Sequence, residues 1–277
     1  MTAFICITCG TQFPPAASAP AECPVCSDSR QYVGLDGQQW TTLDALRDTH
    51  RNVILAEETS VHSIHTQPGF AIGQRAFLIA TPQGNVLWDC ISFLDDATLR
   101  AVRELGGVSA IAISHPHYYS SMVEWSRAFG DAPIYLHEAD QRWIQRPDAN
   151  LRIWAGATNQ IADGFTLIRT GGHFEGFQVL HWRDGAKGHG ALLSGDQPQV
   201  CPDPRWVSFM WSYPNFIPLS ATEIHRVLAI LDPWSFDRLY GAFWPSVVKR
   251  AAKAAVQRSA ARYLDRLSDG ANTAARP

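Results

Sequence analysis

Four cysteines near the start of the chain constrain its fold more than any other feature. Cys6 and Cys9 form one C-x-x-C pair, and Cys23 and Cys26 form a second pair after 13 intervening residues. Because each C-x-x-C turn presents two thiolates to one ion, two such turns complete a tetrahedral shell. The chain begins without a basic segment followed by a long apolar one, so we expect no secretion signal and no oxidising compartment. The cysteines therefore predict a metal site and not a disulfide framework.

The cysteine segment, residues 1–38, resembles a zinc ribbon or a shortened rubredoxin. A rubredoxin would hold iron, but the gap between the two cysteine pairs is short for that fold, so zinc is favoured. Four thiolates leave no open coordination position, which indicates a structural ion. Such a short segment has little core of its own, and we expect metal binding to supply the free energy that folds it. Residues 39–277 then form the main domain.

Size and composition fit one large globular domain beside this small module. Of the 277 residues, 46% are hydrophobic and 18% are charged, which excludes a disordered chain. No window approaches about 18 uninterrupted apolar residues, so we expect no membrane span and no membrane partner. The formal net charge of −3 argues against binding nucleic acid through clustered cations. A cytoplasmic location is the expectation that follows.

Short apolar runs alternate with helical segments through the main domain. Residues 110–114 and 191–194 each predict a buried strand. Residues 40–48 predict a short connecting helix, and residues 246–267 predict a long C-terminal helix. The alternation of strands and helices is typical of an α/β layered fold.

Histidines and an aspartate follow three of the predicted strands. His115 and His117 come directly after residues 110–114, His173 lies in a Gly-Gly-His sequence after a later strand, and Asp196 follows residues 191–194. In open α/β sheets, ligands gather at the carboxyl ends of the strands. Three neutral imidazoles suit a zinc or iron ion. The order of these residues therefore indicates a second metal site, although an isolated His-x-His pair such as His115 and His117 is more often a pair of hydrogen-bonded residues at a strand end.

With these residues in this order, the chain resembles the metallo-β-lactamase-fold hydrolase superfamily over roughly residues 60–245. The resemblance implies an αββα sandwich of two sheets flanked by helices. It also implies that His115, His117 and His173 hold a first metal ion and that Asp196 bridges to a second. By the same resemblance, Asp89, at the end of a hairpin, orients the site without binding metal.

The chain departs from the superfamily at three ligands of the second metal. In the pattern H-x-H-x-D-H, Tyr119 replaces the aspartate and Ser120 replaces the final histidine. The last superfamily histidine would follow a strand at 236–240, where residues 241–244 contain no His, Asp, Glu or Cys. Asp196 alone cannot hold a second ion. We therefore predict one ion, zinc or iron, with Asp196 in or near its fourth coordination position.

A single open metal site predicts hydrolysis of an ester, thioester, lactone or amide by metal-activated water. Asp196 would orient the water as a base, and Tyr118 or Tyr119 would donate a proton to the leaving group or hydrogen-bond an oxyanion. The aromatic stretch 206–213 suggests an apolar wall that favours a hydrophobic small-molecule substrate. A packed helix or a dimer contact would explain that stretch equally well, and homo-oligomer formation stays open.

Two other functions remain open. His117, His173 and Asp196 could hold Fe(II) in a mononuclear oxygenase of the same fold, since two histidines and one carboxylate leave open positions on iron. Alternatively, the chain could be a non-catalytic binding protein that keeps the fold and uses the ribbon to dock a protein partner. An RNA-processing role is disfavoured by the acidic balance and the missing second metal.

Overall fold

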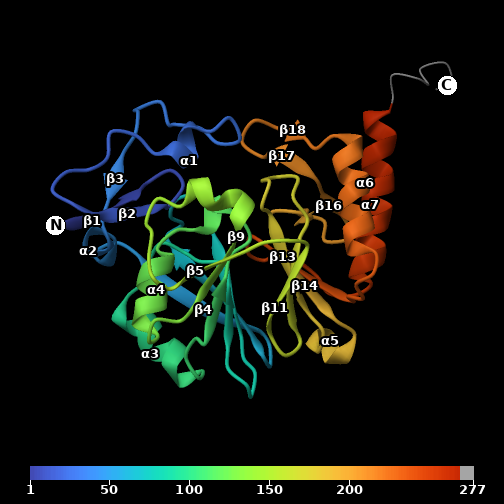
Figure 1. The fold of residues 1–277 in the computed structure, drawn as a ribbon, viewed down its shortest axis with the longest axis horizontal. Coiled ribbons are helices and arrows are strands. Elements are labelled where there is room, and N and C mark those ends of the chain that lie inside the picture. The colour runs from blue at the N-terminus through green and yellow to red at the C-terminus, as the bar shows by residue number, and fades with distance from the viewer. Residues whose placement is uncertain (269–277) are drawn as a thin grey trace. The chain divides into compact units, whose positions relative to one another are not determined.

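A computed structural model describes residues 1–268 and divides into two compact units, Met1–Gly156 and a second unit from Ala157 onward (Figure 1). The first unit contains the cysteine segment and a seven-stranded sheet, and the second contains a six-stranded sheet. Among residues 1–268, no helix is both long and apolar enough to cross a membrane.

The cysteine segment folds as a small three-stranded sheet. Strand β1 (Thr2–Cys6) pairs antiparallel with β2 (Gln12–Ala16) and with β3 (Trp40–Thr41), while helix α1 (Pro24–Ser27) carries the second cysteine pair. The predicted helix over 40–48 is wrong at its start, because Trp40 and Thr41 pair with β1. Helix α2 (Leu43–Arg47) begins only after Thr42, whose hydroxyl accepts a hydrogen bond from the Ala45 amide at 3.1 Å.

The seven-stranded sheet of the first unit joins an antiparallel half to a parallel half. Its order is β10-β9-β8-β7-β6-β5-β4, in which β4 to β7 pair antiparallel and β7 to β10 pair parallel. The strands are β4 (Arg51–Glu58), β5 (Val61–Gln67), β6 (Arg75–Ile79), β7 (Val86–Trp88), β8 (Ala110–Ala112), β9 (Ile134–His137) and β10 (Leu151–Trp154). Helices α3 (Asp96–Glu104) and α4 (Met122–Ala128) connect the parallel strands. Asp89 and His115 therefore follow neighbouring strands at the same edge of the sheet.

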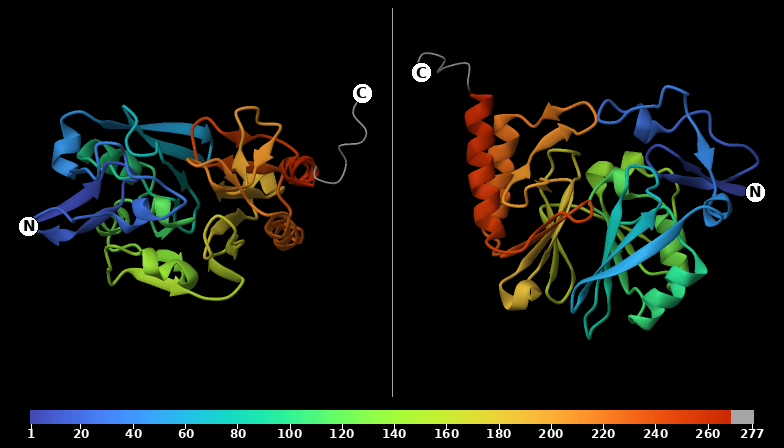
Figure 2. Two further views of the ribbon diagram at one scale, coloured as in Figure 1. Left: turned by 90° about the horizontal axis from the view of Figure 1, so that it is seen from above. Right: turned by 180° about the vertical axis from the view of Figure 1, so that it is seen from behind.

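The six-stranded sheet of the second unit has the order β11-β12-β13-β14-β19-β20. Its strands are β11 (Thr158–Ala162), β12 (Phe165–Arg169), β13 (Gln178–Trp182), β14 (Ala191–Gly195), β19 (Arg238–Gly241) and β20 (Val247–Val248). Helices α6 (Ala221–Leu231) and α7 (Ala252–Leu267) run side by side beside it (Figures 1 and 2). Strands β14 and β19 are parallel, with Gly195 opposite Gly241, so Asp196 and Ala242 leave the sheet at the same edge.

Short elements complete both units. They are the 3-10 helices η1 (Pro116–Tyr118) and η2 (Glu138–Trp143), helix α5 (Gly185–Gly188), and the strands β15 (Gln199–Val200), β16 (Val207–Ser208), β17 (Met210–Ser212) and β18 (Ile217–Pro218).

The long C-terminal helix begins later than the sequence predicted. Val247 and Val248 pair with β19 instead, and Ala251 adopts a positive φ of 50° before α7 starts.

Candidate functional site

Two groups of side chains offer the donor atoms of a metal site. The first comprises Cys6, Cys9, Cys23 and Cys26, whose sulfur atoms all lie within 4.8 Å of one another. The second comprises His115, His117, His173 and Asp196. These are the eight residues that the sequence predicted as ligands.

The spacing of the cysteine sulfurs fits one tetrahedral ion. The Sγ atoms of Cys6 and Cys26 are 3.5 Å apart, and those of Cys9 and Cys23 are 3.6 Å apart. A tetrahedral ion with metal–sulfur bonds of about 2.3 Å separates its sulfurs by roughly 3.8 Å. All four side chains are buried, with Phe13 and Val25 packed around them. A structural ion therefore fits this cluster without rearrangement of the chain.

The surroundings of the cluster favour the thiolate of Cys6 and disfavour those of Cys9 and Cys26 while no ion is bound. The side-chain amide of Gln38 donates to the Cys6 sulfur at 3.1 Å. Hydrogen bonds from Cys23 and Cys26 hold the pKa of the Cys6 thiol well below its ordinary value. Hydrogen bonding to Cys23, with burial, raises the pKa of Cys9 instead, because neighbouring thiolates in one pocket repel each other. A bound cation would remove that repulsion and favour the deprotonated form of all four sulfurs.

The first unit positions His115 and His117 on a turn at the end of β8. Helix η1 bends the chain between them, so that the two buried rings lie with centroids 5.0 Å apart. The Asp89 carboxylate accepts a hydrogen bond from the Ser114 amide at 2.7 Å, which fixes the backbone just before His115. The Ser114 hydroxyl lies 2.9 Å from Nδ1 of His115. That contact engages Nδ1 and presents Nε2 as the metal-binding nitrogen.

The second unit positions His173 and Asp196. Nδ1 of His173 donates to the Met210 carbonyl at 3.2 Å. Because a carbonyl only accepts, the ring proton is on Nδ1 and Nε2 carries the lone pair. Nε2 lies 3.9 Å from an Asp196 carboxylate oxygen, and both side chains are buried. An imidazole nitrogen and a carboxylate at this separation suit adjacent positions around one ion.

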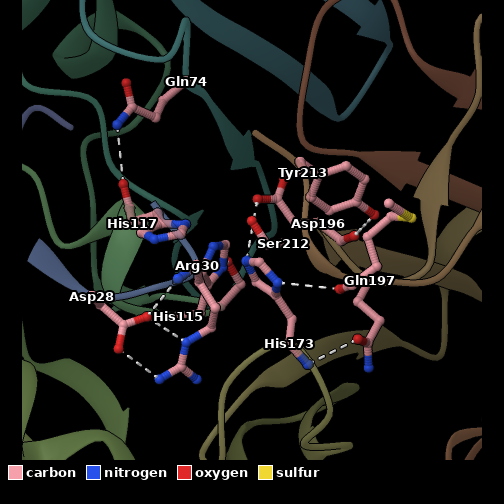
Figure 3. Close-up of polar contacts among 12 residues, drawn as sticks. Asp28, Arg30, Gln74, His115, His117, His173, Asp196, Gln197, Ser212 and Tyr213 are labelled. Atoms are coloured by element: carbon pink, nitrogen blue, oxygen red, sulfur yellow. Dashed lines mark hydrogen bonds and ion pairs between the residues drawn. The ribbon is translucent and has the colours of Figure 1, made fainter. Parts of the chain in front are cut away.

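Gln197 holds the loop that carries His173. Its side-chain oxygen accepts a hydrogen bond from the His173 amide at 2.9 Å (Figure 3). Its side-chain nitrogen donates to the Gly171 carbonyl at 2.7 Å. Gly172 has a φ of +94°, and a Cβ there would lie 2.5 Å from the Gln197 amide nitrogen. The Gly-Gly-His sequence thus supplies both the backbone conformation and the space that Gln197 needs. Sequence reasoning missed Gln197, although its place next to Asp196 was a usable signal.

The two tyrosines of the His115 loop are buried. The Tyr118 ring packs 5.3 Å from the His115 ring, centroid to centroid. The Tyr119 hydroxyl donates to the Asp140 carbonyl at 3.4 Å, and burial together with Asp140 raises the pKa of this phenol well above its usual value. Tyr119 is therefore protonated at neutral pH. The roles suggested for both tyrosines as proton donors stay predictions.

The aromatic stretch 206–213 divides between two environments within the second unit. The Trp206 ring lies under the Arg262 guanidinium of α7, at 3.5 Å, and Phe209 packs edge-on against Tyr263 of the same helix. Tyr213 instead lies 5.8 Å from the His173 ring. Its hydroxyl donates to the Asp196 carbonyl at 2.7 Å. Packing against α7 thus accounts for part of this stretch, while Tyr213 belongs to the metal-ligand region.

Comparison with known sequences finds one related protein over the full length of the chain. The chain is 49% identical over 270 residues to "Uncharacterized protein YmaE" of Bacillus subtilis (strain 168), and the match covers 97% of this chain and 98% of that protein. No protein-family model matches the chain.

Comparison with solved structures shows the fold. The crystal structure of VMB-1 matches with a TM-score of 0.59 at 11% identity, covering 79% of this chain and 99% of VMB-1. DIM-1 metallo-β-lactamase matches with a TM-score of 0.55 at 11% identity, covering 76% and 98%. The chemotaxis sensor ODP, crystallised as a peroxy diiron species, matches with a TM-score of 0.54 at 17% identity, covering 78% and 99%. The mixed α/β sandwich of the metallo-β-lactamase type, preceded by a four-cysteine cluster, is thereby confirmed.

Proposed function

Since the chain belongs to the same family as YmaE of Bacillus subtilis and has the metallo-β-lactamase fold, we propose that it is a metal-dependent hydrolase with one ion in its active site. The proposal rests on the burial and the hydrogen bonding of the candidate ligands. His115, His117, His173 and Asp196 are all buried, and backbone or hydroxyl groups engage Nδ1 of two of these histidines. Such partners orient metal-binding imidazoles and fix their tautomer.

We propose a single ion because the chain offers neutral groups where a second ion would need charged or basic ones. Tyr119 is protonated and bonded to a carbonyl, and Ser120 contributes only a hydroxyl. After β19, the side chain of the buried Ala242 has no atom that could bind a metal ion. Two divalent ions close together repel each other strongly, and Asp196 alone supplies one negative charge to offset them.

A divalent ion held by these residues would supply Lewis-acid chemistry and would lower the pKa of a nearby water towards neutrality. Asp196 would accept the proton of the attacking water. That proton is then available to the leaving group of an ester, thioester, lactone or amide. Tyr213 fixes the Asp196 backbone through its hydroxyl and places an aromatic ring beside His173, where it can contact an apolar small-molecule substrate.

For the cysteine segment we propose a structural zinc ion. The sulfur spacing and the donor from Gln38 support a closed shell of four thiolates. This ion would hold residues 1–38 in place and take no part in the chemistry.

Metal content per chain tests the proposal. We expect two ions in the wild-type protein, one in a Cys6→Ser/Cys9→Ser variant, and one in His173→Ala. His189→Ala is a matched control, because His189 is exposed and lies outside both groups. The His173→Ala protein should also lose hydrolysis of an ester and thioester panel, while the control keeps it.

The same preparations separate the alternatives. Iron at the histidine group together with substrate-dependent oxygen uptake would replace the hydrolase by the mononuclear oxygenase. A wild-type protein with one ion, lost on mutation of the cysteines, would refute any metal-dependent activity and favour a non-catalytic binding protein.

A further inference from the structure

Within the first unit, a buried glutamine joins the four-cysteine cluster to the turn that carries His115 and His117, called the histidine turn below. The Gln74 side-chain nitrogen donates to the Cys9 carbonyl at 2.7 Å. It also donates to the His117 carbonyl at 3.0 Å (Figure 3). A primary amide nitrogen has two hydrogens, and here each hydrogen has its own acceptor. One side chain thus connects a residue of one candidate metal site to a residue of the other. Nothing in the sequence predicted this connection.

Other hydrogen bonds hold the turn between Cys9 and Gln12 against residues near His117. The Gln12 amide donates to the Ser120 carbonyl at 3.1 Å, and the Ser92 hydroxyl donates to the Gly10 carbonyl at 2.8 Å. Gly10 has a φ of +82°, and a Cβ there would lie 2.3 Å from the Ser92 hydroxyl and 3.3 Å from the Gln74 nitrogen. The turn between Cys9 and Gln12 therefore packs against Gln74, Ser92 and the end of the histidine turn at several points.

We propose that the four-cysteine cluster and the histidine site are coupled, with Gln74 as the positioning residue that transmits the coupling. When the cysteines hold an ion, Cys9 is fixed and its carbonyl orients Gln74. Gln74 then holds the His117 carbonyl, and so the backbone from which the His117 ring projects. This inference rests on the proposed function, since it concerns the affinity of the histidine group for its own ion.

The physical reason is the dependence of the cysteine segment on its ion. Its sheet has three short strands and its core is the cysteines with a few packed neighbours, so loss of the ion would loosen Cys9 and the Gly10 turn. Gln74 would then lose one of its two acceptors and the constraint on its side chain. Because coupling between binding sites is reciprocal, the ion at the histidine group should also tighten binding at the cysteines by the same factor.

The test replaces Gln74 by leucine and compares it with a matched control. Asn85 is the control because its amide nitrogen also donates to two carbonyls, of Leu105 and Gly107, at 2.9 Å each. Gln74 and Asn85 are equally buried, each 4% exposed, and Asn85 lies at the opposite end of β7 from Asp89. Gln74→Leu deletes two buried hydrogen bonds. Asn85→Leu deletes three, because the Asn85 side-chain oxygen also accepts from the Thr81 amide at 3.2 Å, and it should therefore lower the melting temperature at least as much.

The readout is the affinity of the histidine group for cobalt(II), with the cysteine site already filled. Cobalt bound to thiolates absorbs in the near ultraviolet through sulfur-to-metal charge transfer, so the two sites are distinguished by their spectra. We expect Gln74→Leu to weaken the histidine site by about tenfold or more, the usual effect of removing a group that orients a ligand. Asn85→Leu should change this affinity by less than about twofold, which is well below the effect of removing a group that orients a ligand.

A second comparison tests the coupling itself. In a Cys6→Ser/Cys9→Ser background, the histidine site should be weakened by a similar factor, and adding Gln74→Leu should have no further effect. If wild type and Gln74→Leu bind cobalt equally at the histidines, the coupling is refuted while the hydrolase proposal stands. If the wild-type histidines bind no ion at all, the proposed function fails and the coupling fails with it. Should the cysteine variant not fold, the comparison of Gln74→Leu with Asn85→Leu decides alone.

Discussion

Replacing Gly172 by alanine should destabilise the second unit through two separable effects. The first is backbone strain, because Gly172 has a φ of +94°, where an L-residue costs about 1–2 kcal/mol. The second is displacement of Gln197, since the new Cβ would lie 2.5 Å from its amide nitrogen and 2.8 Å from its oxygen. Moving Gln197 breaks its hydrogen bonds to the His173 amide and the Gly171 carbonyl, worth about 1 kcal/mol each. The expected total is about 3–4 kcal/mol, the sum of these two effects.

Gly156→Ala isolates the strain from the displacement. Gly156 has a φ of +95°, nearly that of Gly172, and a Cβ there would meet nothing within 4 Å. This variant should therefore lose only the strain of about 1–2 kcal/mol. The assay is urea unfolding of both variants, with the free energy of unfolding compared at an unchanged m-value.

The difference in the free energy of unfolding between the two variants tests the role given to Gln197. Gly172→Ala should be less stable than Gly156→Ala by about 2 kcal/mol, the cost of the two hydrogen bonds of Gln197. It should also bind metal less tightly at the histidine group, because the His173 amide loses its acceptor. Equal free energies of unfolding for the two variants would refute the role given to Gln197.

Three further predictions follow from single contacts. Asp89→Ala should cost about 1–3 kcal/mol in urea unfolding, because the buried Ser114 amide loses its acceptor, whereas Asp89→Asn keeps an acceptor and should cost less. Gln38→Leu removes the hydrogen bond to the Cys6 sulfur and should weaken metal binding at the cysteines by about tenfold in a chelator competition. With the cysteine site filled, the histidine group should keep its affinity in a direct titration. Burial lowers the pKa of His181, so the unfolded chain binds more protons below about pH 6.5 and stability falls as the pH drops. His181→Gln should flatten that fall between pH 7.5 and 5.5, and an unchanged slope would contradict it.

The parts of the fold that follow local rules were predictable from the sequence. The strand over 110–114 and the placement of His115 directly after it depend on a short apolar run between polar segments, and β8 follows that pattern. The two C-x-x-C pairs predicted the cysteine cluster, because four cysteines at that spacing are typical of a metal site. The start of the C-terminal helix was not predictable, because Val247 and Val248 gain partners in β19 that only the folded sheet supplies.

The ligand residues of the candidate site were predictable, and so was Asp89, but the two glutamines that hold the ligand backbone were not. Histidines and an aspartate after strands are visible as residue types in order along the chain. Gln74 bonds only to backbone carbonyls of Cys9 and His117, residues far from it in the sequence, and any position with a carbonyl is an acceptor. A buried glutamine therefore has the same sequence signature as an exposed one, and its role appears only once the chain has folded.

Each candidate ligand pair is held by an uncharged amide acting on the backbone. Gln74 donates to the His117 carbonyl, and Gln197 accepts from the His173 amide, so neither glutamine touches the imidazole ring of the ligand it holds. An amide fixes position without adding charge, so the two glutamines add nothing to the charges of Asp196 and of Asp89, which lies beside the Ser114 amide. A buried carboxylate in either place would add a negative charge close to the ion and favour binding of a second cation. The neutral side chains of Tyr119, Ser120 and Ala242 and the two neutral amides are thus consistent with one arrangement, which suits the single ion proposed above.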